Sequence, residues 1–142
     1  MTLNRQYRQA ILYPFVAVIL CTLIYSTLDN YNYKSEWLTA GSVIFLSVIW
    51  AFLYSLIISG FALTIFLNKF EKVRTNNLLV ILSWFLLPFS FIGVIINHEI
   101  TFEMKYESGK LGSDFIYVLI LNVPFTVGLI WSYFKYRKIN RA

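Results

Sequence analysis

The sequence predicts an all-α membrane protein in which four transmembrane helices form one bundle and one domain. Hydrophobic residues make up 58% of the 142-residue chain and charged residues only 13%, about half the charged share of a typical soluble domain. Four stretches contain no Asp, Glu, Lys or Arg, namely 9–28, 37–68, 75–97 and 115–134. Each matches or exceeds the roughly 20 residues that a helix needs to cross the hydrocarbon core of a bilayer.

The charges divide unequally between the two sides of this bundle. If both termini and the middle connection share one side, that side holds nine lysines and arginines, and the other side holds three. Cytoplasmic loops carry an excess of these residues, so we predict that both termini are cytoplasmic. The net charge is then +8 inside and −3 outside, which accounts for the +5 of the chain. The basic residues fall in three separate segments, so they do not form the single basic patch that is typical of nucleic-acid binding, and we predict no nucleic-acid partner.

The first span, 9–28, is predicted to be retained as a helix. It is longer than the apolar region of a signal peptide, and no A-x-A-like cleavage site follows it. Pro14 falls in its first turns, where a missing N–H costs least. The abundance of Asn, Ile, Tyr and Lys favours an AT-rich bacterial genome. We therefore predict an integral protein of the bacterial cytoplasmic (inner) membrane.

The second span, 37–68, is too long to cross a bilayer upright. Its 32 uncharged residues would make a helix of about 48 Å at 1.5 Å per residue, against a hydrocarbon core of about 30 Å. The helix must tilt, bend or protrude. Gly60, next to Ser59, is the predicted point of flexure.

The second span also carries a row of small residues at every fourth position: Ser47, Ala51, Ser55 and Ser59. On a helix they form one ridge, and small residues let membrane helices approach closely. One interpretation is packing against another span of the same chain. The other is a contact between copies of the chain, or a stripe that lines a pore.

The third and fourth spans each contain a proline near mid-membrane, Pro88 and Pro124. A proline leaves the carbonyl four residues earlier without its helical donor, and in lipid that carbonyl needs another partner. Asn122 is the most polar side chain at this depth. The pattern predicts a polar, kinked region between the third and fourth spans.

The outer connections alternate between apolar and polar residues over 100–107 and again over 30–34. A period of two is typical of a strand, so the two connections are predicted to pair as a short extracytoplasmic β-ribbon. The ribbon would present a partner surface made of Tyr31, Tyr33, Phe102, Met104 and Tyr106.

The sequence offers little for catalysis, and we predict no enzyme, no cofactor and no metal site. His98 and Cys21 are the only histidine and cysteine, and they lie too far apart in depth to form a dyad or a zinc site. No G-x-S-x-G, Walker or dinucleotide-binding motif is present. No ionisable residue lies at the centre of a span, which disfavours proton-coupled transport.

These observations favour a small, non-catalytic membrane protein that acts by protein–protein interaction. It would be a subunit of a membrane complex or an immunity-type protein against a membrane-active toxin. The alternative is a homo-oligomeric ion channel or pore-forming effector, because hydroxyl and amide side chains can line a pore. The expected partners are the lipid bilayer and either another protein or a second copy of the chain.

Overall fold

The computed structural model describes residues 3–32, 38–106 and 113–141, and it confirms the all-α fold class over this part of the chain. Four helices are long and apolar enough to cross a membrane: Leu3–Asp29, Ala40–Lys69, Asn77–Phe102 and Phe115–Ile139. Each of them contains most or all of one predicted span. The prediction of four candidate transmembrane helices is therefore confirmed.

The first long helix comprises α1 (Leu3–Tyr7), the π-helical segment η1 (Arg8–Leu12) and α2 (Tyr13–Asp29). It begins earlier than predicted, so Pro14 lies well inside it and not in its first turns. A proline ring inside a helix clashes with the carbonyl four residues earlier, here that of Ala10. The π-helical turn, in which the Tyr13 N–H donates to the Arg8 carbonyl, widens the helix just before the proline and relieves this clash.

The second long helix changes type along its length. Thr39 caps the start of α3 (Ala40–Phe61), because its Oγ1 accepts a hydrogen bond of 3.2 Å from the Ser42 N–H. At Ala62, two residues after Gly60, α3 passes into the 3₁₀ helix η2 (Ala62–Lys69). A 3₁₀ helix rises about 2.0 Å per residue, so this span is longer still than a plain α-helix would be.

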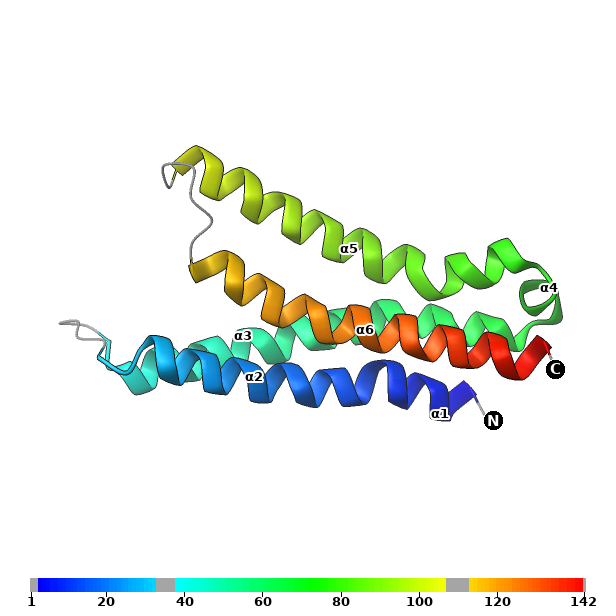
Figure 1. Ribbon diagram of the computed structural model, residues 1–142, viewed down its shortest axis with the longest axis horizontal. Helices are drawn as coiled ribbons and strands as arrows, with labels where there is room; N and C mark the ends of the chain where they lie inside the picture. The colour runs from blue at the N-terminus through cyan, green and yellow to red at the C-terminus, as the bar shows by residue number, and fades with distance from the viewer. Residues whose placement is uncertain (1–2, 33–37, 107–112, 142) are drawn as a thin grey trace.

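The remaining elements are α4 (Glu71–Arg74), α5 (Asn77–Tyr106) and α6 (Ser113–Arg141). Asn76 caps α5, since its Oδ1 accepts a hydrogen bond of 3.0 Å from the Leu78 N–H. Figure 1 shows that α5 bends in its first half, the half that contains Pro88. We attribute the bend to this proline, which removes one helical hydrogen bond.

The predicted β-strand over 100–106 is wrong, because these residues continue α5 to Tyr106. The Thr101 hydroxyl donates to the Asn97 carbonyl at 2.7 Å, a contact across one helical turn. Extending an existing helix adds one hydrogen bond per residue, whereas an isolated two-stranded ribbon is marginal in stability. In the predicted partner strand, 30–34, residues 30–32 form a turn after α2, and residues 33 and 34 lie outside the described residues.

The helices pack around one hydrophobic core, whose largest fully buried side chains include Trp84, Phe125 and Ile58. Helix α6 contacts both α2 and α5, while α3 lies against α2. Both termini and α4 lie at one end of the molecule, which we call the terminal end (Figure 1). At the opposite, distal end, α5 diverges from the pair α2 and α3, and the start of α6 lies between them (Figure 1). We call α5 and the pair α2 and α3 the two arms.

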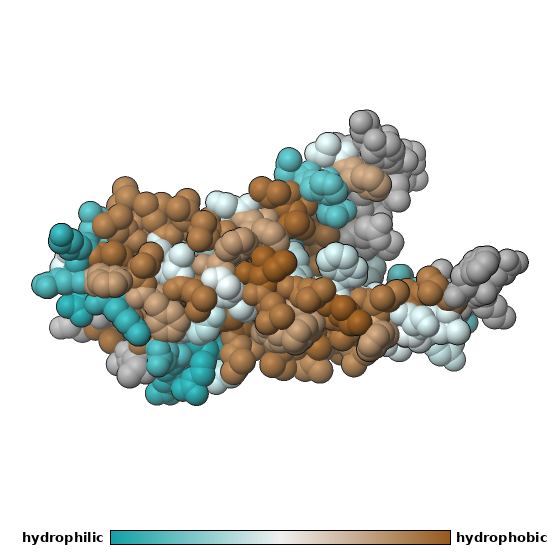
Figure 2. All heavy atoms as spheres, turned by 180° about the vertical axis from the view of Figure 1, so that it is seen from behind, coloured by the Kyte–Doolittle hydropathy of each residue, from teal (hydrophilic) through white to brown (hydrophobic). Residues whose placement is uncertain are grey.

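The surface has the character expected of a protein surrounded by lipid. Figure 2 shows hydrophobic residues around the middle of the molecule and hydrophilic residues gathered at the terminal end. The described basic residues other than Lys105, which belongs to the last turn of α5, lie on elements at that end: Arg5, Arg8, Lys69, Lys72, Arg74, Lys135, Arg137, Lys138 and Arg141. Large exposed side chains such as Phe45 and Leu53 have no described protein partner covering them, which is unfavourable in water and ordinary in a bilayer.

Candidate functional site

A cleft opens at the distal end, where the two arms diverge. It encloses about 430 Å³ and is bordered by the last turns of α2, the first turns of α3 and the start of α6. Its lining combines aromatic and polar side chains, among them Tyr25, Ser26, Asp29, Asn30, Ser47, Trp50 and Tyr117. Figure 2 shows the arms standing apart at this end of the molecule. We call this cavity the distal cleft.

The rim of the distal cleft is fixed by local hydrogen bonds. Asn30 ends α2, and both its backbone N–H and its Nδ2 donate to the Ser26 carbonyl, at 3.1 and 3.0 Å. These bonds satisfy a carbonyl of the last turn, which has no donor within the helix. On the other side, the Tyr117 hydroxyl donates to the Ser47 carbonyl at 2.8 Å and ties α6 to α3. The cleft therefore has a defined shape.

Asn122 lies in the interior, 2% exposed, and connects α6 to α3. Its Oδ1 accepts a short hydrogen bond from the Tyr54 hydroxyl, and its Nδ2 donates to the Val118 carbonyl at 2.7 Å. An amide in lipid needs such partners, because the surroundings offer none. Asn122 therefore acts as a polar tie between two spans.

The polar kink was predicted between the third and fourth spans, but the polar partner of Asn122 is on the second span. Pro88 is buried in α5, and Pro124 is half-buried beside a groove between α2 and α6. Two hydrogen bonds to Ser83 of α5 also come from the second span. Thr64 Oγ1 donates to the Ser83 carbonyl, and Asn68 Nδ2 donates to Ser83 Oγ, both at 2.7 Å.

The small-residue ridge of α3 faces other helices of the same chain. Ala51 and Ser55 are fully buried, while Ser47 and Ser59 are half-buried. Two tyrosine hydroxyls from other helices reach backbone carbonyls of the ridge: Tyr117 donates to that of Ser47, and Tyr7 donates to that of Ser59 at 2.9 Å. Small side chains leave these carbonyls accessible, which supports the intramolecular interpretation of the ridge.

The predicted outer-loop surface is divided between the two arms. Tyr31 follows α2 and is 80% exposed, whereas Phe102 lies near the end of α5, stacked on His98 with ring centroids 6.3 Å apart. Tyr33 lies outside the described residues. Met104 and Tyr106 belong to the last turn of α5, and their side chains are likewise outside the description. Of the residues whose side chains are described, Tyr31 and Phe102 lie on different arms and not on one ribbon.

Apart from Ser47, sequence reasoning missed the residues that line the distal cleft, and it missed the partners in the ties between helices. Tyr25 carried a usable signal, since aromatic residues gather at the ends of membrane spans, whereas Trp50 falls inside the predicted span 37–68. Tyr54 carried none, because its position within a uniformly apolar helix does not show which neighbour it faces. Among the described residues, no group of three or more His, Cys, Asp or Glu side chains could hold a metal ion.

Known protein families, curated proteins and solved structures yield no match to the chain.

Proposed function

We propose that this protein is a non-catalytic four-helix bundle of a bacterial cytoplasmic membrane, and that it acts by binding another protein through the distal cleft. The distal cleft carries the proposal, because aromatic side chains at its mouth stand beside polar groups of fixed geometry. Trp50 is 67% exposed although it borders the cavity. Tyrosine and tryptophan are enriched at the centres of protein interfaces.

The charge distribution favours a partner that arrives from outside the cytoplasm. All described basic residues except Lys105 lie at the terminal end, and an excess of this kind is typical of the cytoplasmic side. The distal cleft opens on the other side, with Asp29 on its rim. This placement suits either a subunit of a membrane complex or an immunity-type protein that meets a membrane-active toxin before it inserts.

A photo-crosslinking amino acid at residue 50, in cells of the source organism, tests the proposal. We expect a discrete protein adduct from this position. Phe45 provides the matched control, since it lies on the same helix and is similarly exposed, at 65%, but does not border the cavity. An adduct of equal yield from residue 45, or none from residue 50, would contradict recognition at the cleft.

An ion channel or pore-forming effector is the second candidate, and buried polar atoms favour it. Four side chains bury a polar atom that has no hydrogen-bond partner among the described residues: Gln6, Thr22, Ser55 and Ser132. Each such atom costs about 1–3 kcal/mol unless water reaches it, so a hydrated path inside the protein would satisfy them. Discrete currents from purified protein in planar bilayers would favour this candidate over the first.

A further inference from the structure

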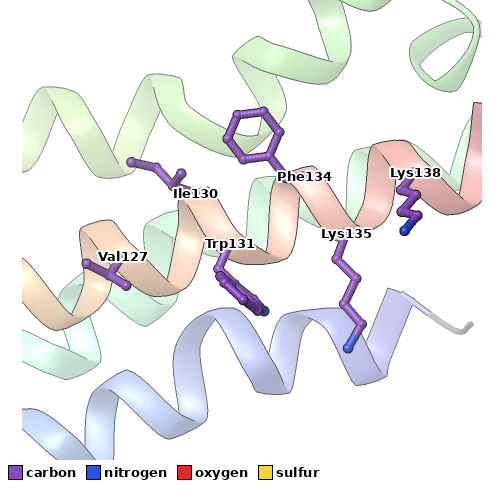
Figure 3. A pocket seen from close by; sticks show the side chains of 6 residues that line it. All are labelled: Val127, Ile130, Trp131, Phe134, Lys135 and Lys138. Atoms are coloured by element: carbon purple, nitrogen blue, oxygen red, sulfur yellow. The ribbon is translucent and has the colours of Figure 1, made fainter.

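A groove runs along the outward face of α6 in its terminal half. It encloses about 620 Å³ and is lined by Val127, Ile130, Trp131, Phe134, Lys135 and Lys138. Figure 3 shows Ile130 and Phe134 on the side toward α5, and Trp131 and Lys135 on the side toward α1 and α2. The groove is apolar toward mid-membrane and cationic toward the terminal end.

A second groove lies beside the first, between α2 and α6. It encloses about 390 Å³ and shares Val127 and Trp131 with the first groove as a common wall. Trp131 is 71% exposed, and its indole stands between the two. At the terminal end, Lys135 Nζ donates to Gln9 Oε1 at 3.4 Å and so joins the polar ends of the two grooves.

We propose that the paired grooves bind one anionic diacyl phospholipid. One acyl chain lies in each groove, on either side of Trp131, and the phosphate is held by Lys135 and Lys138. Each ammonium group offers three hydrogen-bond donors, and basic pockets between transmembrane helices suit acidic head groups. This site is at the end of the molecule opposite the distal cleft, so it is independent of the proposed function.

The charges near the grooves favour an anionic lipid over a partner helix. No acidic residue is among the described residues that line either groove, so nothing there neutralises Lys135 and Lys138. An apolar helix laid over this face would cover two ammonium groups without pairing them, which is costly in a bilayer. A phosphate at headgroup depth pairs with both. Arg137 is directed elsewhere, since its Nη1 donates to Asn77 Oδ1 at 2.6 Å.

Native mass spectrometry of the purified full chain tests this site. The protein is equilibrated in detergent with equal amounts of phosphatidylglycerol and phosphatidylcholine that carry the same acyl chains. We expect one retained phosphatidylglycerol, and weaker retention of lysophosphatidylglycerol, which can fill only one groove. Lysines near a membrane surface favour acidic lipid. Replacing both, Lys135→Gln with Lys138→Gln, should therefore lower the preference for phosphatidylglycerol by about tenfold or more.

The control variant combines Lys69→Gln with Lys72→Gln. These two lysines have the same spacing in the chain and lie at the same end of the molecule, but neither is among the lining residues of the grooves. The control should keep the wild-type preference. The single change Lys138→Gln, at an exposed position, provides a milder test if the double variant expresses poorly. Equal losses in both double variants, or equal retention of the two lipids by the wild type, would overturn the proposal.

Discussion

At the residue scale, a close approach of α6 to the first long helix depends on Gly128. A Cβ atom added there would collide with the ring of Pro14 and would lie 2.9 Å from the Ala10 carbonyl oxygen. That carbonyl has lost its helical donor, because Pro14 has no N–H. The proline and the glycine therefore act together: one exposes a carbonyl, and the other lets α6 lie directly against it.

Gly128→Ala is expected to lower the free energy of unfolding by about 1–3 kcal/mol, the usual cost of overpacking. The added methyl meets backbone and a proline ring, neither of which can turn aside. Gly93→Ala is the matched control, because nothing lies within 4 Å of a Cβ added there. In α5 this change should be neutral or stabilising by up to about 1 kcal/mol. Thermal unfolding in detergent compares the two, and equal stabilities would contradict the close contact.

At the scale of the elements, polar ties determine which helices are neighbours. The bond from Tyr54 to Asn122 joins α3 to α6, and the bonds of Thr64 and Asn68 to Ser83 join η2 to α5. In lipid the hydrophobic effect does not distinguish one apolar helix from another, so packing and hydrogen bonds do so. The second span, with ties to both later spans, is thus central to the arrangement.

A double-mutant cycle on Tyr54→Phe and Asn122→Leu tests the first tie. We expect a coupling energy of about 0.6–1.7 kcal/mol, the range measured for hydrogen bonds between membrane helices. Neither single change should prevent folding. For comparison, Thr64→Val removes a different tie, ten residues along the same span. The stability change caused by Thr64→Val should add to that caused by Asn122→Leu within about 0.5 kcal/mol. A coupling energy near zero for Tyr54 and Asn122 would show that the hydrogen bond between them does not stabilise the protein.

The sequence allowed the spans to be predicted but not their neighbours. Charge-free stretches such as 115–134 identify helices because a bilayer requires every backbone group to be paired within its own segment. The hydrogen-bond partner of Asn122 could not be predicted. The helical period of 3.6 residues shows which residues share a face of the helix, but it does not show which neighbouring helix that face contacts. The alternation over 100–106 led to the wrong prediction of a strand. Extending the helix already formed in 77–99 is more favourable than starting a new strand.

At the scale of the whole molecule, shape and charge vary along the same axis. The terminal end is basic and holds the connection α4, while the distal end divides into two arms and carries the distal cleft, which is bordered by α2, α3 and the start of α6. A lipid site at one end and a protein site at the other would fit this polarity. The proposed functions therefore require one particular orientation in the membrane, with both termini in the cytoplasm.

Reporter fusions test that orientation. Fusions after Lys72 and after Arg141 should be active only with a cytoplasmic reporter, and fusions after Asn30 and residue 109 only with an external one. The physical reason is the excess of lysines and arginines within a few residues of the span ends at the terminal side. Neutralising Lys135, Arg137 and Lys138 together should not invert the protein, because six basic residues remain on that side against three on the other. An external C-terminus in the wild type would contradict this topology, and with it the proposal that a partner reaches the distal cleft from outside the cytoplasm.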